Sequence, residues 1–271
     1  MDIKRLVIKS FGNIEYLDLK PRELTNCVTK DVANAVSYIL NNQFAIRHYN
    51  TVEPKSDTYL FGELHQYKKG KKVVYTVEIN GFDSPIIKKD GVKMTEEEIN
   101  SDLYISRPYR EDNGCIFSVG SRSEFLDYGE FLPLYFSRLT EYSLAFKDVL
   151  ENRNVYCDEE YLSVGFTRGK PIFYKRKSKN HSFMPYKEVS DYDRALGEYA
   201  IFLQLLEMVN YHRQFKSENG IVGVPIIVDG LLSKINATSF NVRFLMSRTR
   251  EIGRQTFFVE KRPEEFERLV R

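Results

Sequence analysis

Residues 23–40, ELTNCVTKDVANAVSYIL, constrain the fold of this chain more than any other stretch. A short apolar segment passes through a turn into apolar residues at helical spacing, namely Ala33, Val36, Ile39 and Leu40. This pattern predicts a strand that leads into a helix over residues 32 to about 41. Such a strand–turn–helix near the N-terminus often binds a phosphate, but this turn contains no glycine. Glycine lets backbone N–H groups converge on a phosphate. Because this turn has none, the sequence predicts a strand–turn–helix that does not bind phosphate in the usual way.

Alternating apolar and polar residues predict antiparallel hairpins in three places. Residues 3–19 give two strands around Phe11 and Gly12, and residues 59–79 give two more, joined by KKGKK. Residues 161–177 give the third hairpin, which turns at Arg168 and Gly169. We interpret GFTRGKP in this hairpin as a β-turn and not as a displaced phosphate-binding loop, because its glycines are one residue too close and no helix follows.

The other patterns predict helices and short strands. Asp90 and Gly91 form a turn, after which Thr95 and Glu98 stand at the capping-box positions of a helix. Further helices are expected over residues 130–151, 191–215 and 240–252. Short strands are expected over residues 114–120, 224–230 and 255–261, the last followed by a charged tail. The run VPIIVDG is typical of a buried parallel strand. The sequence contains no repeat or Pro/Gly-rich linker, so a single α/β domain is the simplest interpretation.

Charge and cysteine content exclude several classes of protein. The 271 residues include 40 Lys+Arg and 38 Asp+Glu, so a net charge of +2 indicates no strong electrostatic partner. Three widely spaced cysteines, Cys27, Cys115 and Cys157, fit neither a disulfide framework nor a zinc site and suit a reducing compartment. Without an apolar leader or a membrane-length apolar run, we expect a cytoplasmic protein with no membrane partner.

The order of these segments resembles the ATPase head of the RecF, SMC and Rad50 group of ABC-type proteins, over nearly the whole chain. The resemblance is carried by IKRLVIKSFGNIEYLDL, ALGEYAIFLQLLEMVN, VPIIVDGLLSKIN and GRQTFFVEK. It implies a P-loop-like α/β fold, with a mixed, mainly parallel sheet, flanking helices and an N-terminal antiparallel lobe. One head domain would span residues 1–271, with an N-lobe over about 1–125 and a C-lobe over about 155–271. The family's long coiled coil has no room in this chain, so the compact RecF type is the nearer match.

The resemblance also assigns the nucleotide-handling positions, and each carries a different residue. The phosphate-binding pattern GxxxxGK[ST] is replaced by CVTKDVANAV, where Lys30 is the only cation and is interpreted as a solvated turn residue. Val119 stands where the family has a glutamine that helps to hold magnesium and water. The signature LSGGE is replaced by RALGE, which keeps Gly197 and Glu198 but lacks the serine.

The last two positions differ in the same way. The family's Asp-Glu pair is here Asp229 and Gly230, and an isolated Asp at the end of a strand also suits a capping role. Lys261 stands at or near the position of the family's histidine. Five changed sites in an intact apolar framework predict a pseudo-ATPase without catalytic residues, cofactor or metal. The alternative is a divergent ATPase that uses Lys30 and Asp229 to bind ATP and Mg²⁺.

A basic segment predicts where nucleic acid would bind. The segment FYKRKSKNH carries four candidate DNA-binding cations, Lys175, Arg176, Lys177 and Lys179. The competing interpretation is a solvated edge strand whose lysines discourage aggregation, as we also expect for the basic turn over residues 66–72. The predicted function is therefore binding of double-stranded DNA, or of an active ATPase head as a homodimer or heterodimer, in DNA repair or defence against foreign DNA. A scaffold that binds only protein is the other alternative.

Overall fold

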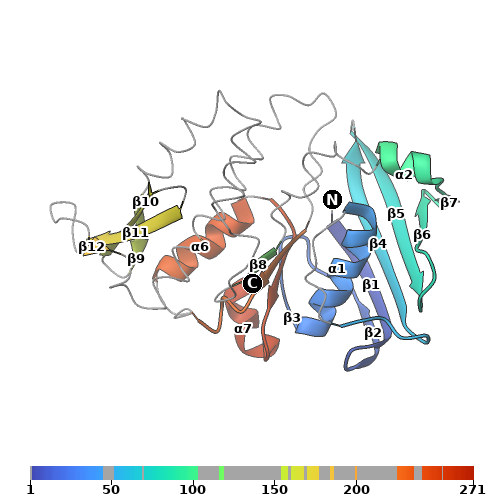
Figure 1. The fold of residues 1–271 in the computed structure, drawn as a ribbon, viewed down its shortest axis with the longest axis horizontal. Coiled ribbons are helices and arrows are strands. Elements are labelled where there is room, and N and C mark those ends of the chain that lie inside the picture. The colour runs from blue at the N-terminus through green and yellow to red at the C-terminus, as the bar shows by residue number, and fades with distance from the viewer. Residues whose placement is uncertain are drawn as a thin grey trace. The chain divides into compact units, whose positions relative to one another are not determined.

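The computed structural model describes residues 2–44, 52–68, 70–102, 116–118, 154–157, 160–167, 170–176, 184–185, 199, 225–234, 240–251 and 253–271 (Figure 1). The fold is mixed α/β, and the chain divides into two compact units. The first unit consists of Met1–Ile116, Arg213–Val228 and Gly253–Arg271, and the second of Phe117–His212 and Asp229–Ile252. The single head domain with its two lobes stays a prediction. The helices expected over 130–151 and 191–215 lie outside the described residues, apart from Tyr199, which is helical.

An antiparallel sheet of six strands dominates the first unit, in the order β2-β1-β4-β5-β6-β7. Its strands are β1 (Asp2–Phe11), β2 (Ile14–Leu19), β4 (Tyr59–Lys68), β5 (Lys71–Asn80), β6 (Ile86–Lys89) and β7 (Val92–Lys93). Both hairpins predicted from the alternating pattern are confirmed. The Asp90–Gly91 turn is confirmed too, with φ values of 48° and 86°. A two-residue turn with both φ values positive has the twist that antiparallel strands prefer.

Helix α1 (Lys30–Phe44) covers one face of this sheet (Figure 1). It begins two residues earlier and ends three residues later than the sequence pattern predicts. Gly62 of β4 makes the close approach possible, because a Cβ at this position would lie 2.7 Å from Cγ2 of Ile39. The shared core is made of fully buried aliphatic side chains, which include Ile3, Leu6, Ile8, Val36, Ile39, Leu60 and Leu64.

A second sheet has the order β3-β14-β13-β8. Its strands are β3 (Thr25–Val28), β14 (Thr256–Val259), β13 (Ile226–Asp229) and β8 (Ile116–Ser118), so the expected short strands are confirmed. Strands β3 and β14 are parallel, although they are more than two hundred residues apart in the chain. Every residue of β14 is buried, as are residues 226–228 of β13.

The C-terminus was predicted to be a charged tail, and this prediction is wrong. Residues Pro263–Val270 form helix α7, which begins with a proline in its first turn and ends with the fully buried Val270. The hydroxyl of Thr25 on β3 donates a hydrogen bond to the carbonyl of Val270. The helix was missed because half of its residues are charged and only Val270, next to Thr25 of β3, is buried.

Gln255 joins the two sheets of the first unit. Its side chain is fully buried, and its Oε1 accepts a hydrogen bond of 2.7 Å from the N–H of Ile3. Its Nε2 donates to the carbonyls of Ile3 at 2.9 Å and of Arg22 at 2.7 Å. The side-chain amide therefore pairs with the start of β1 as a neighbouring strand would. This one side chain makes hydrogen bonds with three backbone groups.

The second unit contains an antiparallel sheet in the order β12-β11-β10-β9. Its strands are β9 (Asn154–Cys157), β10 (Glu160–Thr167), β11 (Lys170–Arg176) and β12 (Met184–Pro185). The predicted hairpin β10–β11 is confirmed by the pairing of Thr167 with Lys170, while the turn residues Arg168 and Gly169 lie outside the described residues. Helix α6 (Phe240–Glu251) confirms the predicted helix, and the hydroxyls of Tyr199 and Thr249 lie 2.7 Å apart in the interior.

Helix α2 (Glu96–Asp102) has the predicted capping box. The N–H of Glu98 donates to the hydroxyl of Thr95 at 3.2 Å, and the N–H of Thr95 donates to the Glu98 carboxylate at 2.8 Å. These reciprocal bonds satisfy two groups that a helix N-terminus leaves without partners. Among the helices that the structure describes, none combines the length and hydropathy needed to cross a bilayer.

Candidate functional site

The junction of β3 and α1 is where a phosphate-binding loop would be expected. Strand β3 ends at Val28 and α1 begins at Lys30, so Thr29 alone connects them. The N–H of Ala33 already donates to the carbonyl of Thr29 at 3.1 Å, which places the first helical turn directly after the strand. A phosphate cradle needs several successive N–H groups in a loop that bends around the ligand. A connection of one residue leaves no such loop.

A carboxylate lies at the first turn of this helix. Asp31 Oδ2 accepts hydrogen bonds of 3.0 Å from both the backbone N–H and the side-chain Nδ2 of Asn13 in the β1–β2 turn. The neighbouring Gly12 has a φ of +58°, and a Cβ on it would approach the Asp31 carboxyl carbon to 2.7 Å. The hairpin is therefore packed onto the helix N-terminus. A negative charge is favourable there, and it would repel a phosphate that approached the same N–H groups.

The end of β14 lies beside the end of β3. Val259 pairs with Val28, and the N–H of Glu260 donates to the Val28 carbonyl at 3.0 Å. Lys30 and Lys261 each stand two residues beyond this pair. Two candidate residues therefore follow the carboxyl ends of neighbouring strands, and both are exposed.

Glu260, and not Lys261, directly follows β14, and it is only 6% exposed. The sequence interpretation missed this residue. Its signal was an acidic residue next to the apolar run TFFV.

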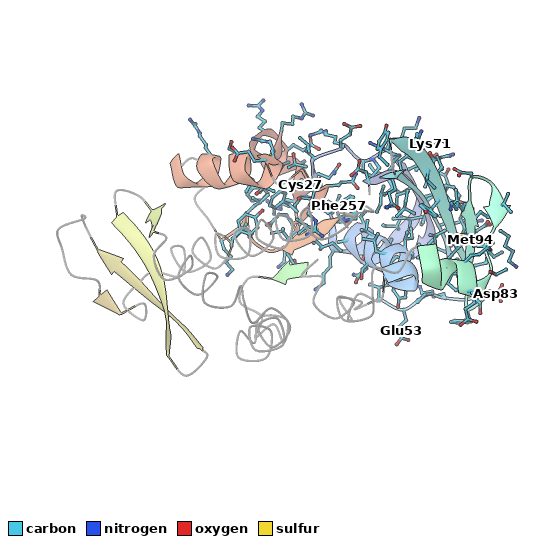
Figure 2. The ribbon with its side chains drawn as sticks, turned by 90° about the horizontal axis from the view of Figure 1, so that it is seen from above. Cys27, Glu53, Lys71, Asp83, Met94 and Phe257 are labelled. Carbon is cyan, nitrogen blue, oxygen red and sulfur yellow. The ribbon has the colours of Figure 1, made fainter. Side chains whose placement is uncertain are left out.

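Cys27 lies on β3 beside β14, near Phe257 of that strand (Figure 2). Burial, together with the nearby charges of Glu260, Glu267 and Glu264, raises the pKa of the Cys27 thiol to about 12. A thiol in this environment stays protonated and is not a nucleophile. Cys27 therefore contributes to packing and not to chemistry.

The end of β13 holds the second expected pair. Asp229 is the last residue of the strand and is half-buried. Gly230 has a φ of +67°, a backbone conformation that other residues adopt only with strain. This conformation explains why glycine suits the position where a glutamate was expected. The next turn is closed by the N–H of Lys234, which donates to the Leu231 carbonyl at 3.0 Å. No hydrogen bond to the Asp229 side chain occurs among the described residues, and its capping role stays a prediction.

The remaining predicted residues are placed in part. Lys175 and Arg176 lie on β11, while Lys177, Lys179, Val119, Gly197 and Glu198 fall outside the described residues. Strand β11 pairs with β10 on one side and, at Lys175, with Met184 of β12 on the other. The interpretation of this segment as an edge strand is therefore wrong at Lys175. No group of potential metal ligands occurs within the part of the chain that the structure describes.

Solved structures of SMC heads share this fold. An SMC head bound to the C-winged helix domain of ScpA has 12% identity and a TM-score of 0.58, over 95% of this chain and 88% of that one. The SMC head domain from Thermotoga maritima has 12% identity and a TM-score of 0.53, over 100% and 91%. The Smc head with an extended coiled coil, bound to the C-terminal domain of ScpA derived from Pyrococcus furiosus, has 11% identity and a TM-score of 0.50, over 95% and 89%.

At these identities the likeness concerns the fold alone, and it confirms the expected SMC-type ABC ATPase head fold. No protein-family model matches the chain. A search of curated proteins gives no match either.

Proposed function

We propose that this chain is a non-catalytic protein with an SMC-type head fold that acts by binding. Its partner is double-stranded DNA or an active ATPase head, in DNA repair or genome defence in the cytoplasm. The observation that carries the proposal is the single residue, Thr29, between β3 and α1. We also propose that the sheet is mainly parallel and P-loop-like. Such a sheet would preserve the head fold after the phosphate loop has been lost.

Electrostatics at the junction support the same conclusion. The first turn of α1 carries the Asp31 carboxylate, which accepts two hydrogen bonds from Asn13. Glu260 adds an acid at the end of β14, next to β3. A triphosphate at this edge would approach both carboxylates, whereas nucleotide sites gather cations and N–H donors. Loss of hydrolysis follows if the nucleotide is not bound.

Calorimetric titration of the full chain with ATP and MgCl₂ tests the nucleotide part. We expect no saturable heat, and Asp31→Asn should not create an ATP site, because the loop is still missing. Saturable ATP binding that Asp229→Ala abolishes would overturn the proposal. It would favour the divergent ATPase, whose specific support is the position of Lys30 and Lys261 at the same sheet edge.

Titration with a fluorescent DNA duplex at several salt concentrations tests the DNA part. We expect binding that weakens as salt increases, and that weakens further when the four cations Lys175, Arg176, Lys177 and Lys179 are changed to alanine. The matched control changes Lys71 and Lys72, two exposed lysines at the start of β5, and should have little effect. If the unmodified chain and the control variant both fail to bind DNA, the proposed DNA binding is rejected and the protein-only scaffold is favoured.

The protein arm rests on analogy at the level of the fold. Two of the solved SMC heads are bound to domains of ScpA, so heads of this shape can present surfaces to another protein. For this chain we propose self-association or pairing with an active head. Light scattering with size exclusion, with and without ATP, measures it. A strictly monomeric chain that captures no ATPase head would contradict this arm.

A further inference from the structure

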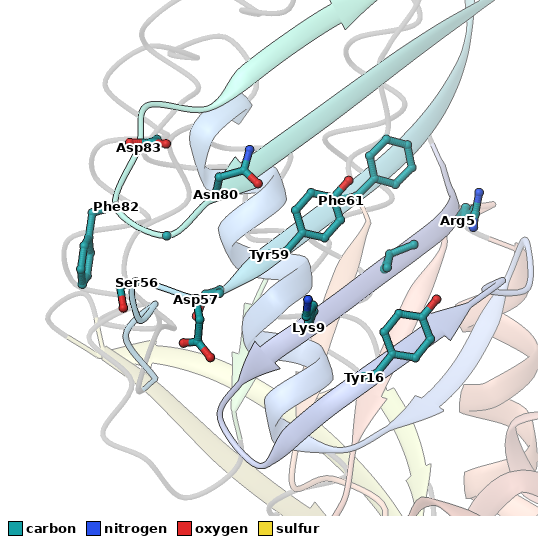
Figure 3. A pocket seen from close by; sticks show the side chains of 13 residues that line it. Arg5, Lys9, Tyr16, Ser56, Asp57, Tyr59, Phe61, Asn80, Phe82 and Asp83 are labelled. Atoms are coloured by element: carbon teal, nitrogen blue, oxygen red, sulfur yellow. The ribbon is translucent and has the colours of Figure 1, made fainter.

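The sheet face opposite α1 is hollowed. An open depression of ≈ 850 Å³ lies over β1, β2, β4 and β5 and is closed at one end by the loops around Ser56 and Phe82 (Figure 3). Because side chains alternate along a strand, Leu60 enters the core under α1 while its neighbours Tyr59 and Phe61 face the depression. No residue of the hollow belongs to β3, β13, β14 or the start of α1, so the hollow is separate from the candidate nucleotide position.

Aromatic side chains line the hollow and are unusually exposed. Tyr16 is 66% exposed and Phe82 is 79% exposed, which places both among the five exposed large apolar side chains of the described residues. Register aligns Tyr16, Lys9 and Tyr59 in one row across three strands. Aromatic groups left exposed around one concave surface are typical of a site that a partner covers.

The end of the hollow near Phe82 is held in place before any partner binds. The N–H of Gly81 donates to the Thr58 carbonyl at 2.7 Å, and the Thr58 hydroxyl donates to the Ser10 carbonyl at 2.7 Å. Gly81 has a φ of +52°, and a Cβ on it would lie 2.7 Å from the Ser56 carbonyl oxygen. Two loops from different parts of the chain are thus fastened together. A preformed surface loses less conformational entropy on binding.

The charges that are not neutralised are mainly acidic. Asp57 and Asp83 lie at the end of the hollow near Phe82, and their carboxylates form no ion pair or hydrogen bond with the described residues (Figure 3). Arg5 is neutralised by Asp18, to which its Nε and Nη2 donate at 3.0 and 2.7 Å. One cation of the lining, Lys9, stays without an ion pair among the described residues.

Burial and the nearby charge of Glu78 raise the pKa of Tyr59, so Glu78 adds a third acid at this face. The surface would therefore repel a phosphate backbone and attract a cation.

We propose that this hollow binds an extended, basic segment of a protein partner. An arginine or lysine of the segment would lie between Asp57 and Asp83 and against the ring of Phe82, where a cation gains from both the carboxylates and the aromatic face. Tyr59 and Phe61 would pack against the aliphatic part of the same segment. The inference is independent of the proposed loss of ATP binding, since the two involve different residues.

Fluorescence polarisation of the full chain with two capped peptides tests the proposal. One peptide alternates glycine and arginine, and the other alternates glycine and glutamate. We expect the arginine peptide to bind, and the glutamate peptide not to bind. Asp57→Asn with Asp83→Asn, and separately Phe82→Ala, should each weaken arginine-peptide binding by about fivefold or more. Matched controls are Glu97→Gln, an exposed acid of α2, and Tyr67→Ala, which is 75% exposed on β4 outside the hollow.

The controls should bind the arginine peptide as the unmodified chain does, and thermal unfolding should show that every variant is folded. The proposal is overturned if neither peptide binds, or if the hollow variants bind as well as the controls. Displacement of the arginine peptide from the unmodified chain by duplex DNA, with the same sensitivity to Phe82→Ala, would overturn it as well, because the hollow would then be a nucleic-acid site.

Discussion

Gln255→Ala is predicted to be among the most destabilising single substitutions in the first unit. The side chain is fully buried and makes three hydrogen bonds, to the N–H and carbonyl of Ile3 and to the carbonyl of Arg22. Its removal leaves the buried N–H and carbonyl of Ile3 without this partner and creates a cavity between two sheets, while the Arg22 carbonyl keeps a hydrogen bond of 3.1 Å from Nδ2 of Asn26. A buried polar group left without a partner costs about 1–3 kcal/mol. Since a carbonyl has a second lone pair and can relax, we expect a total loss of about 3–5 kcal/mol.

Gln255→Glu separates hydrogen bonding from volume. A carboxylate keeps the acceptor for Ile3 but places negative oxygens against two carbonyls, so the folded state favours the protonated acid. The pKa of the new acid is therefore expected to be higher in the folded than in the unfolded chain. The folded state then binds more protons, and the stability of the variant must fall as pH rises above the unfolded value of about 4.3. A stability that rises over this range would contradict the argument.

Gln66 provides a matched control for both variants. It is also buried, at 4% exposed, but its Oε1 has no hydrogen-bond partner among the described residues. Gln66→Leu is therefore expected to be neutral or stabilising by about 1 kcal/mol. Unfolding in urea, followed by far-UV circular dichroism because the chain has no tryptophan, measures the free energy of all three variants. A loss below about 1 kcal/mol for Gln255→Ala, or an equal loss for Gln66→Leu, would refute the reasoning.

Three further predictions concern packing, capping and a thiol. Gly62→Ala should cost about 1–3 kcal/mol, because its Cβ would lie 2.7 Å from Cγ2 and 3.0 Å from Cδ1 of Ile39. Ile39→Val in the same chain removes Cδ1 and should restore part of the loss in urea unfolding. Thr95→Ala should cost about 0.5–2 kcal/mol by removing the capping box with Glu98, and amide hydrogen exchange of α2 should increase; unchanged protection would contradict it. Burial raises the pKa of Cys27 to about 12, so iodoacetamide should alkylate Cys27 at least tenfold more slowly in the folded chain than in urea, as mass spectrometry of the peptide would show. Because the folded chain holds this proton more tightly, the stability that Cys27 contributes should decline as pH rises above the usual thiol value of 9.0.

Local structure could be predicted because it depends on neighbours in the sequence. The alternation in residues 3–19 and 59–79 was enough for both hairpins, and Thr95 with Glu98 was enough for the start of α2. The missing glycine after β3 likewise predicted the absence of a phosphate loop at Thr29. Each of these features involves residues that lie close together in the chain, so propensity and short-range hydrogen bonds decide them.

Only the tertiary structure decided which distant residues meet. Glu260 lies at the end of β3 because β14 pairs with that strand, and Gln255 reaches Ile3 across 252 positions of sequence. The sequence pattern predicted a charged tail at α7, because the burial of Val270 next to β3 depends on a contact across the whole chain. The hollow required strands β1, β2 and β4 to align Tyr16 with Tyr59. The sequence by itself determined the N-terminal hairpins, the capped start of α2 and the lost loop. Their long-range pairing, which depends on buried contacts that no local pattern encodes, determined the surfaces on which binding is proposed.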